Sequence, residues 1–200
     1  MIELVVASTS AGKIREIRDA LSGLDVALLA LAEVGWSDEI AETGESFEGN
    51  AVLKAETVAA GVGKLALADD SGLEVDALRG GPGVYSTRFA GPETTQQERN
   101  VELVRRLRET GAPPPWPAQY RCVLALAGPE LPTRTFEGLC RGAIVPEPRG
   151  TGGFGYDPIF LLPDRSLTVG ELALAEKQGI SHRGEALRKL CEWLRGTYPA

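Results

Sequence analysis

The chain has 200 residues, of which 43% are hydrophobic and 24% charged, a composition typical of a globular domain with a buried core. Its formal net charge of −7 argues against a surface for nucleic-acid polymers, because phosphate backbones are bound by clustered Lys and Arg. The sequence shows three scattered cysteines, no signal-peptide pattern and no long apolar stretch. We therefore expect a cytoplasmic protein without a membrane partner, folded as one domain over residues 1–200.

The N-terminal segment has the order strand, loop, helix. The apolar residues 2–7 predict a strand, and the small residues 8–12 (Ser-Thr-Ser-Ala-Gly) predict a loop. The spacing of the apolar residues after Lys13 predicts a helix that runs to Leu21. This arrangement points backbone N–H groups and a helix dipole at a phosphate, and Lys13 would add a positive charge. An ordinary turn between a strand and a helix is the alternative.

An acidic patch precedes the second predicted helix. Residues 25–31 predict a strand, and Glu42 lies in the acidic stretch that follows it. Ser46 is the predicted N-cap of the helix. Asn50 and Lys54 are four residues apart and therefore share one helical face. Glu42 matters for function only if the fold brings it beside the aspartates described next.

Two adjacent carboxylates follow a short apolar run in the middle of the chain. Residues 65–68 are typical of a buried strand, and Asp69 and Asp70 come directly after them, with a turn predicted at Ser71-Gly72. Carboxylates at the end of a buried strand are costly unless a cation meets them, and Mg²⁺ prefers such oxygen ligands. Because successive strand side chains point to opposite faces, we expect one of the two aspartates to face the metal. A solvated turn that closes the strand is the alternative.

The second half of the chain contains a glycine-rich stretch between predicted strands and helices. The patterns predict a helix over 94–110, a Pro-rich hinge or lobe connection over 111–117, strands over 120–127 and 135–145, and two C-terminal helices. Residues 150–158 match G-x-G-x-x-G, but an apolar run follows them instead of a helix, which argues against a dinucleotide fold. Phe154 in this flexible run offers a stacking face for a base. A turn with buried aromatic residues is the alternative.

Five segments, in this order and spacing, resemble the inosine/xanthosine triphosphate pyrophosphatase family. They are 7–13 (ASTSAGK), 42–55 (ETGESFEGNAVLKA), 68–91 (ADDSGLEVDALRGGPGVYSTRFAG), 148–160 (PRGTGGFGYDPIF) and 176–187 (EKQGISHRGEAL). The resemblance implies an α/β fold with a long mixed β-sheet flanked by helices, two lobes and a central substrate cleft. It also implies a Mg²⁺-dependent, homodimeric enzyme. Its reaction would convert deaminated purine nucleoside triphosphates (ITP, dITP, XTP) to the monophosphate and pyrophosphate, clearing aberrant nucleotides from the precursor pool.

The resemblance further implies roles at the phosphates. The phosphate loop would comprise Ser8, Thr9, Ser10, Ala11, Gly12 and Lys13. Glu42 and Asp70 would bind Mg²⁺, and Asp70 would also accept the proton of the attacking water. Lys13 is the second predicted catalytic residue, and Lys54 would add a further cation. Supporting and substrate-side positions are Asp69, Asn50 and Ser71.

At the base, the resemblance implies that Phe154 stacks on the purine. Gly155, Tyr156 and Asp157 would line the base pocket. The edge of the base and the nearby sugar or phosphate would be contacted by Lys177, His182 and Arg183.

Four positions depart from the family pattern. Ser8 and Ser46 replace Thr and keep the hydroxyl, whereas Ser10 replaces Asn and loses an amide. Gly49 replaces a Glu and removes a charge near Glu42. Two alternative functions remain open at this stage: a related pyrophosphatase for modified pyrimidine nucleotides, and a module that senses a nucleotide without cleaving it.

Overall fold

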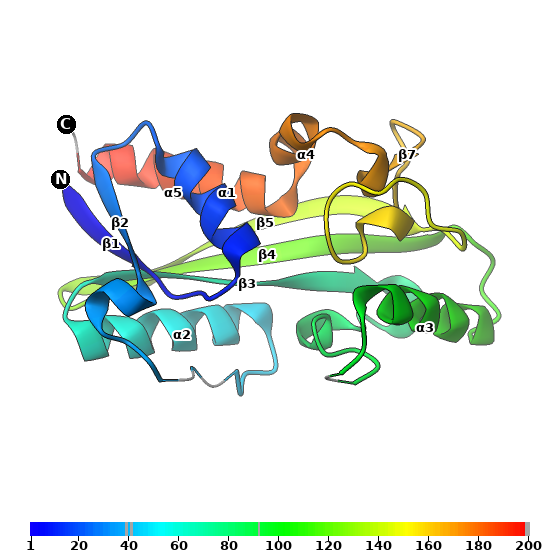
Figure 1. Ribbon diagram of the computed structural model, residues 1–200, viewed down its shortest axis with the longest axis horizontal. Coiled ribbons are helices and arrows are strands. Elements are labelled where there is room, and N and C mark those ends of the chain that lie inside the picture. Colours follow the sequence, from blue (N-terminus) through cyan, green and yellow to red (C-terminus); the bar gives the residue numbers. More distant parts are fainter. Residues whose placement is uncertain (39, 41, 92, 199–200) are drawn as a thin grey trace. The chain divides into compact units, whose positions relative to one another are not determined.

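The computed structural model describes residues 1–38, 40, 42–91 and 93–198 (Figure 1). Its strands are β1 (Ile2–Val6), β2 (Val26–Ala30), β3 (Leu65–Val75), β4 (Trp116–Gly128), β5 (Leu131–Ile144), β6 (Phe160–Leu162) and β7 (Leu167–Thr168). Its α-helices are α1 (Ala11–Leu21), α2 (Phe47–Val62), α3 (Gln96–Glu109), α4 (Leu174–Ile180) and α5 (His182–Thr197). The described strands form a seven-stranded sheet in the order β2-β1-β3-β4-β5-β6-β7. This sheet confirms the predicted α/β class.

The sheet is mixed. β1 pairs in parallel with β2 and with β3, and these parallel neighbours require crossover connections, which α1 and α2 supply. β6 pairs antiparallel with both β5 and β7. The predicted N-cap of α2 is confirmed, because the Ser46 hydroxyl accepts a hydrogen bond from the backbone N–H of Gly49.

Strand β3 corrects the expectation of a turn at Ser71-Gly72. The strand does not end before the aspartates but continues to Val75, so that Asp69 and Asp70 lie inside it. Asp, Ser and Gly are unfavourable in strands, and this is why the sequence indicated a turn. The strand persists because its neighbours in the sheet and the charged partners of the aspartates outweigh the local preference.

The Pro-rich segment 111–117 also differs from expectation. It joins α3 to β4 within one compact unit of the chain rather than connecting two units, and Trp116 already belongs to β4. The Trp116 indole N–H donates to the Ala112 carbonyl at 2.8 Å, and its side chain is buried. The segment is therefore anchored by the core.

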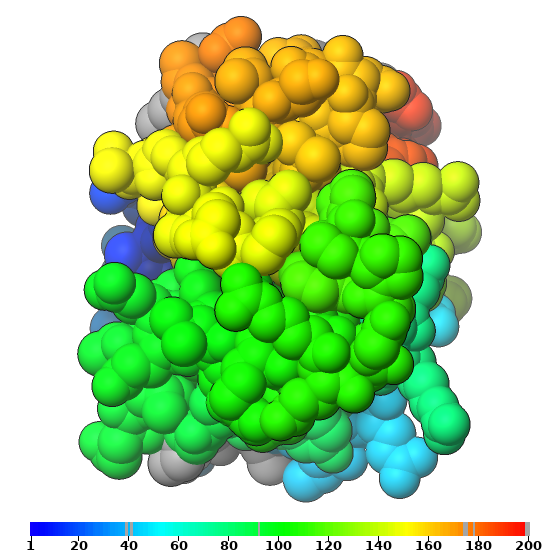
Figure 2. Space-filling view, turned by 90° about the vertical axis from the view of Figure 1, so that its right-hand side faces the viewer, coloured from blue at the N-terminus to red at the C-terminus, as the bar shows by residue number. Residues whose placement is uncertain are grey.

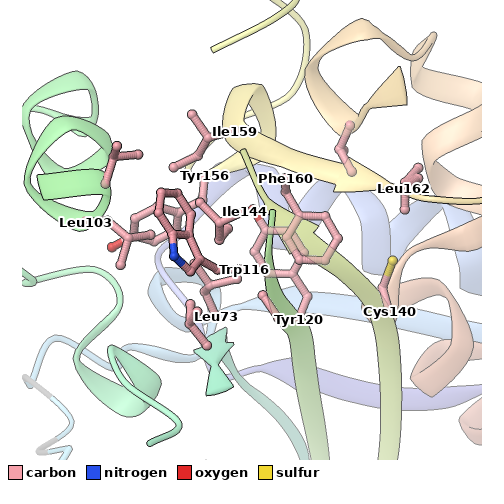
Figure 3. Close-up of a cluster of buried hydrophobic side chains, with 14 of the residues drawn as sticks. Leu73, Leu103, Trp116, Tyr120, Cys140, Ile144, Tyr156, Ile159, Phe160 and Leu162 are labelled. Atoms are coloured by element: carbon pink, nitrogen blue, oxygen red, sulfur yellow. The ribbon is translucent and has the colours of Figure 1, made fainter. Parts of the chain in front are cut away.

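The chain divides into two compact units, each with a hydrophobic core of its own. The first comprises residues 1–70, 122–138 and 182–200, and the second comprises residues 71–121 and 139–181. The first core is formed by side chains of β1, β3, β4, α1 and α5, among them Leu4, Ile17, Leu67 and Leu190. The second core centres on Trp116, Tyr120 and Phe160 (Figure 3). The predicted cleft and the predicted single domain stay predictions.

In the first unit, helices cover both faces of the strands. Figure 1 shows α1 and α5 on one face and α2 on the other. A residue of β3 in this unit can therefore face either the α1–α5 side or the α2 side, depending on its place in the strand alternation. Among the described residues, no helix combines the length and the apolar character that a membrane crossing requires.

Gly138 of β5 is predicted to be essential for the docking of α5. A Cβ atom at this position would lie 2.0 Å from the His182 carbonyl oxygen and 2.6 Å from the Ala186 nitrogen, and both are backbone atoms that cannot turn away. We expect Gly138→Ala to destabilise the fold by about 1–3 kcal/mol through overpacking.

Urea unfolding measures the effect, and Gly196→Ala is the matched control. A Cβ at Gly196, in α5, would meet nothing within 4 Å, so this variant should be neutral or slightly stabilising. Equal stability of Gly138→Ala and wild type would contradict the prediction.

Candidate active site

The adjacent aspartates of β3 point to opposite faces of the strand and meet different helices. The Asp69 carboxylate contacts Lys13 of α1 and Arg183 of α5. The Asp70 carboxylate contacts Asn50 and Lys54 of α2. Both aspartates are buried, so each depends on these partners for its charge balance. Strand alternation thus separates two carboxylates that are neighbours in sequence.

On the α2 side, Lys54 joins two carboxylates. Its ammonium Nζ lies 3.0 Å from Asp70 Oδ1, 3.0 Å from Glu42 Oε1 and 3.0 Å from the Asp69 carbonyl oxygen. The fold therefore brings Glu42 beside Asp70, which is the condition set above for a functional role of Glu42. The two carboxylates converge on a single positive charge.

Asn50 fixes the second oxygen of the same aspartate. Its Nδ2 donates to Asp70 Oδ2 at 3.1 Å, while its Oδ1 accepts from the Gly44 N–H at 2.7 Å. A Cβ at Gly44 would lie 2.7 Å from Asn50 Oδ1, so glycine permits this close approach. Asn50 thereby links the loop that carries Glu42 to the carboxylate of Asp70.

The protonation of this cluster follows from burial and charge. Burial raises the pKa of the Asp70 carboxyl, and the Lys54 ammonium and the Asn50 amide offset this only in part. Burial alone would lower the pKa of Lys54, but the Asp70 and Glu42 carboxylates outweigh it and raise that pKa. Asp70 is thus a carboxylate with increased proton affinity next to a firmly charged ammonium.

The donor set of this cluster fits a hard divalent cation. Within the described ranges no group of three or more His, Cys, Asp and Glu side chains is arranged to hold a metal ion. Glu42 and Asp70 are a pair of carboxylates, and the Lys54 ammonium between them marks a position where their oxygens favour positive charge. Mg²⁺ is commonly bound through one or two carboxylates, with water and phosphate oxygens completing its shell.

On the opposite face, Asp69 belongs to a network of ion pairs. Its Oδ1 lies 2.5 Å from Lys13 Nζ, and its Oδ2 accepts from Arg183 Nε at 2.7 Å. The Nη1 group of Arg183 donates to Glu16 Oε2 at 2.6 Å. The Cys122 thiol donates to Asp69 Oδ2 at 3.3 Å. Two carboxylates and two cations thus form one cluster, in which Asp69 and Arg183 are buried and Lys13 and Glu16 are half-buried.

Asp69 remains ionised throughout the physiological pH range. Burial would raise its pKa, but the charges of Arg183 and Lys13 outweigh burial and hold the pKa of this carboxyl well below its usual range. Burial and the Asp69 charge raise the pKa of the Cys122 thiol, which stays protonated. Asp69 is therefore a fixed anion, in contrast to Asp70.

The predicted phosphate loop lies between β1 and α1. Ser10 is the N-cap residue of α1 by its extended backbone, although its side chain makes no capping hydrogen bond. The Ser10 N–H instead donates to the Ser8 hydroxyl at 3.2 Å. Ala11 and Gly12, in the first turn, are exposed, so the backbone N–H groups that helix geometry leaves there face accessible space.

The second unit contains a separate cluster around Asp157. Lys177 Nζ lies 2.7 Å from Asp157 Oδ2 and 4.2 Å from the centroid of the Phe154 ring. The same oxygen accepts from the Phe154 N–H at 2.8 Å, and Asp157 Oδ1 accepts from the Tyr120 hydroxyl at 3.2 Å. Asp157 and Lys177 are buried, whereas Phe154 is 54% exposed. A buried ion pair therefore supports an exposed aromatic ring.

Two glycines shape the loop that presents Phe154. Gly153 and Gly155 have φ angles of 76° and 69°, in the left-handed region that favours glycine. A Cβ at Gly153 would also lie 2.1 Å from Asp157 Oδ2. Asn100 of α3 donates to the Gly155 carbonyl at 3.3 Å. Figure 2 shows α3, in green, beneath this glycine-rich segment, in yellow.

Phe154 also lines a cavity of about 1080 Å³ within the second unit. The walls come from α3 and from residues 146–159, and they include Asn100 and Val104. Tyr156, in contrast, points into the core, where its hydroxyl donates to the Ser86 carbonyl at 2.8 Å. The ring of Phe154 is thus accessible, while that of Tyr156 is structural.

The predicted site residues fall into both units. The first unit contains Ser8, Thr9, Ser10, Ala11, Gly12, Lys13, Glu42, Asn50, Lys54, Asp69, Asp70, His182 and Arg183, and the second contains Ser71, Phe154, Gly155, Tyr156, Asp157 and Lys177. Arg183 is 2% exposed and engages Asp69 and Glu16, so its expected contact with a base edge stays a prediction, as does that of His182.

Sequence reasoning missed four residues of these clusters. They are Glu16, Cys122, Asn100 and Tyr120. Helical spacing carried a signal for Glu16, which follows Lys13 by three residues and so shares its face of α1. For the others the partner lies far along the chain, and no local pattern indicates it.

Replacement of Asp69 is expected to cost stability in a pH-dependent way. Asp69→Asn leaves the buried charge of Arg183 and the half-buried charge of Lys13 without their shared anion, which should cost about 3–5 kcal/mol at pH 7. Since the pKa of Asp69 is depressed in the folded state, its contribution is complete above about pH 3.8, the ordinary value of the group, and is lost as the pH falls below it.

Urea unfolding of wild type and Asp69→Asn at pH 7, 5 and 3 measures this difference, which should narrow only at the lowest pH. Asp25→Asn is the control, because Asp25 forms an exposed ion pair with the N-terminus and should contribute about 1 kcal/mol or less. A stability difference that is the same at all three pH values would contradict the assignment.

The chain is similar to known proteins over nearly its whole length. A family model described as the Ham1 family matches residues 4–193. The dITP/XTP pyrophosphatase of Bacillus licheniformis is 46% identical over 190 residues, which cover 95% of this chain and 96% of that protein. The dITP/XTP pyrophosphatase of Bacillus subtilis is 45% identical over 194 residues, which cover 97% of this chain and 98% of that protein.

Solved structures agree with this similarity. The HAM1 protein from Coxiella burnetii superimposes with a TM-score of 0.93 at 39% identity, covering 98% of this chain and 100% of that one. A nucleoside-triphosphatase / dITP/XTP pyrophosphatase from Mycobacterium abscessus gives a TM-score of 0.80 at 38% identity, covering 94% of this chain and 98% of that one. By sequence and by fold, the chain belongs to the Ham1 family.

Proposed function

We propose that this protein is a Mg²⁺-dependent nucleoside triphosphate pyrophosphohydrolase that converts ITP, dITP and XTP to the monophosphate and pyrophosphate. The dITP/XTP pyrophosphatases to which it is similar support the reaction and the substrate class. The observation that carries the proposal is the convergence of Glu42 and Asp70 on one cation, 3.0 Å from each. A nucleotide-sensing module has no need of such a pair.

In this proposal Glu42 and Asp70 hold Mg²⁺. Their carboxylates are the hard oxygen ligands that this ion prefers, and they are already drawn together around the Lys54 ammonium. When bound, the ion would neutralise phosphate charge and polarise the reacting phosphoryl group. Lys54 supplies a second positive charge on the same side of β3.

Asp70 is the proton acceptor for the attacking water. The water oxygen forms a bond to a phosphorus atom that carries the oxygen bridging the α and β phosphates. The bond between this phosphorus and the bridging oxygen breaks, so that the monophosphate and pyrophosphate separate, and the water proton passes to Asp70. Burial supports this role because it raises the pKa of Asp70 and with it the proton affinity of the carboxylate. The hydrogen bond from Asn50 to Oδ2 holds the carboxylate in one orientation.

The triphosphate is bound by the loop before α1 and by lysines. Backbone N–H groups of the first turn and the positive end of the helix dipole attract phosphate oxygens. Lys13 extends from the same turn, and its ammonium contacts Asp69 of β3. This supports the roles expected for Ser8, Thr9, Ser10, Ala11 and Gly12.

The purine is bound by the Asp157 cluster. Lys177 lies over the Phe154 ring, so a base would stack on the other face of that ring. The Lys177 ammonium has three N–H groups and lies near the ring, and such a donor favours a purine that carries oxygen at C6 over the amino group of adenine. His182 and Arg183 are further expected donors.

We also propose a homodimer in the cytoplasm, as the family resemblance implies. The buried thiols of Cys122, Cys140 and Cys191 are consistent with a reducing compartment. Light scattering of the purified protein tests the dimer, and a monomer at all concentrations would refute it.

The proposed reaction is tested with a panel of purine and modified pyrimidine triphosphates, with products separated by chromatography. ITP should give IMP and pyrophosphate in one step with Mg²⁺ present, and accumulation of IDP and orthophosphate would refute the cleavage site.

Asp70→Asn should remain folded but lose at least about 10²–10⁴-fold in kcat, because it removes both a general base and a metal ligand. A fully active Asp70→Asn protein would exclude the assigned role.

Phe154→Ala is expected to weaken the binding of inosine triphosphate and of adenosine triphosphate to a similar extent. Stacking contributes about 1–3 kcal/mol per base and does not distinguish bases, so kcat/KM for ITP and for ATP should fall by a similar factor. Tyr198→Ala removes an exposed aromatic ring elsewhere and should change neither value. A change in the ITP/ATP ratio on Phe154→Ala would show that the ring takes part in base choice.

A further inference from the structure

Polar side chains on one face of α3 form a hydrogen-bonded chain that ends at the glycine-rich loop. Gln96 and Asn100 are four residues apart, and the Gln96 Nε2 group donates to Asn100 Oδ1 at 3.0 Å. The Asn100 Nδ2 group donates to the Gly155 carbonyl oxygen at 3.3 Å. At the other end of the chain, Arg99 Nη1 lies 3.5 Å from Gln96 Oε1. The chain therefore joins α3 to the residue that follows Phe154.

The two ends of this chain determine how both amide groups are oriented. A backbone carbonyl only accepts hydrogen bonds, and a guanidinium only donates them. The Gly155 carbonyl requires the NH₂ group of Asn100, which leaves the Asn100 oxygen for the NH₂ group of Gln96. The Gln96 oxygen then faces the Arg99 guanidinium. Asn100 thus supplies a donor to the loop, which neither Asp nor Leu, of similar size, could supply.

Helix α3 is a fixed support for this contact. Its inner side chains belong to the hydrophobic core of the second unit, and they are Leu103, Val104 and Leu107. A capping box formed by Thr95 and Glu98 satisfies backbone groups at its N-terminus. Asn100 lies between the cap and the core residues, so its side chain extends from a segment that is fixed on both sides.

The loop, in contrast, depends on such anchors. Gly153 and Gly155 have positive φ angles and, as glycines, have access to many other conformations. The Phe154 N–H donates to Asp157 Oδ2 at 2.8 Å, and Asn100 binds the carbonyl group of the next residue. Because the Phe154 ring is 54% exposed, these backbone contacts on either side of it determine where the ring lies.

From these contacts we propose that Asn100 is a positioning residue for nucleotide binding: its amide, oriented by Gln96, ties the Gly155 carbonyl to α3 and so fixes the loop that presents the Phe154 ring. The anchors are complementary, since Asp157 holds a backbone donor and Asn100 holds a backbone acceptor of adjacent residues. The consequence for binding rests on the proposed function, in which a base stacks on this ring.

Two substitutions remove the donor in different ways. Asn100→Leu removes it without adding a charge. Asn100→Asp keeps an acceptor for Gln96 but places a carboxylate oxygen against the Gly155 carbonyl, so both variants should release the loop. Arg106→Gln is the control, because it lowers the charge of α3 by one, as Asn100→Asp does, at an exposed position where Arg106 pairs with Glu102.

The first measurement is hydrogen exchange of the protein without substrate, followed by mass spectrometry of peptides. The N–H groups of Phe154 and Asp157 donate to the Asp157 carboxylate and to the Phe154 carbonyl, so their exchange reports the opening of the loop. This exchange should be about threefold faster or more in both Asn100 variants, and as in wild type in Arg106→Gln. Peptides from β1 and β2 serve as the internal reference.

The second measurement is steady-state kinetics with ITP and ATP. A displaced ring weakens substrate binding but removes no group that transfers a proton, so KM for ITP should rise about tenfold in both Asn100 variants with kcat changed about twofold or less. The ratio of kcat/KM between ITP and ATP should stay the same, because stacking does not distinguish bases. Arg106→Gln should have wild-type values.

A double variant shows whether Asn100 acts through Phe154. If it does, Asn100→Leu combined with Phe154→Ala should have a KM for ITP within about twofold of Phe154→Ala alone, whereas two independent losses would multiply. Independent losses, or an unchanged KM in the Asn100 variants, would overturn the proposal, even where the melting temperature falls or loop exchange rises. If wild type does not hydrolyse ITP but loop exchange still rises in Asn100→Leu, Asn100 positions the loop and the proposed function fails.

Discussion

The structure depends on the burial of two adjacent carboxylates within one strand. Asp69 and Asp70 are 2% and 7% exposed, and an ionised carboxylate without a partner at such positions would cost several kcal/mol. The alternation of β3 makes both positions possible, because it directs one carboxylate to α1 and α5 and the other to α2. The cations and amides of these helices are therefore requirements of the strand as well as parts of a candidate site.

One step along the strand separates two different kinds of acid. The pKa of Asp69 is held low, since two cations outweigh its burial, whereas burial prevails at Asp70 and raises its pKa. Pairs of carboxylates whose environments move their pKa values apart are a general sign of divided roles. Here the fixed anion orients the surrounding cations, and the carboxylate with the higher proton affinity is the one placed beside Glu42.

Local sequence patterns predicted the features that depend on interactions between residues close in sequence. Ser46 caps α2 because its hydroxyl can reach the Gly49 N–H, and both residues lie within one turn. The course of β3 through Ser71 and Gly72 could not be predicted, because neighbouring strands and distant charges override the preference of these residues for a turn. The contact between Glu16 and Arg183 spans 167 residues, so only the folded chain reveals it.

In the second unit, a buried carboxylate paired with a lysine likewise stabilises a loop. Asp157 is a buried carboxylate paired with a lysine, and one of its oxygens also accepts the backbone N–H of Phe154. Glycine at 153 and 155 gives the loop its left-handed turns, but glycine alone would leave many conformations open. Because a buried anion must keep its donors, Asp157 selects the conformation in which Phe154 is presented to solvent. In both units, then, a buried carboxylate paired with a lysine fixes the position of a neighbouring residue of the candidate site.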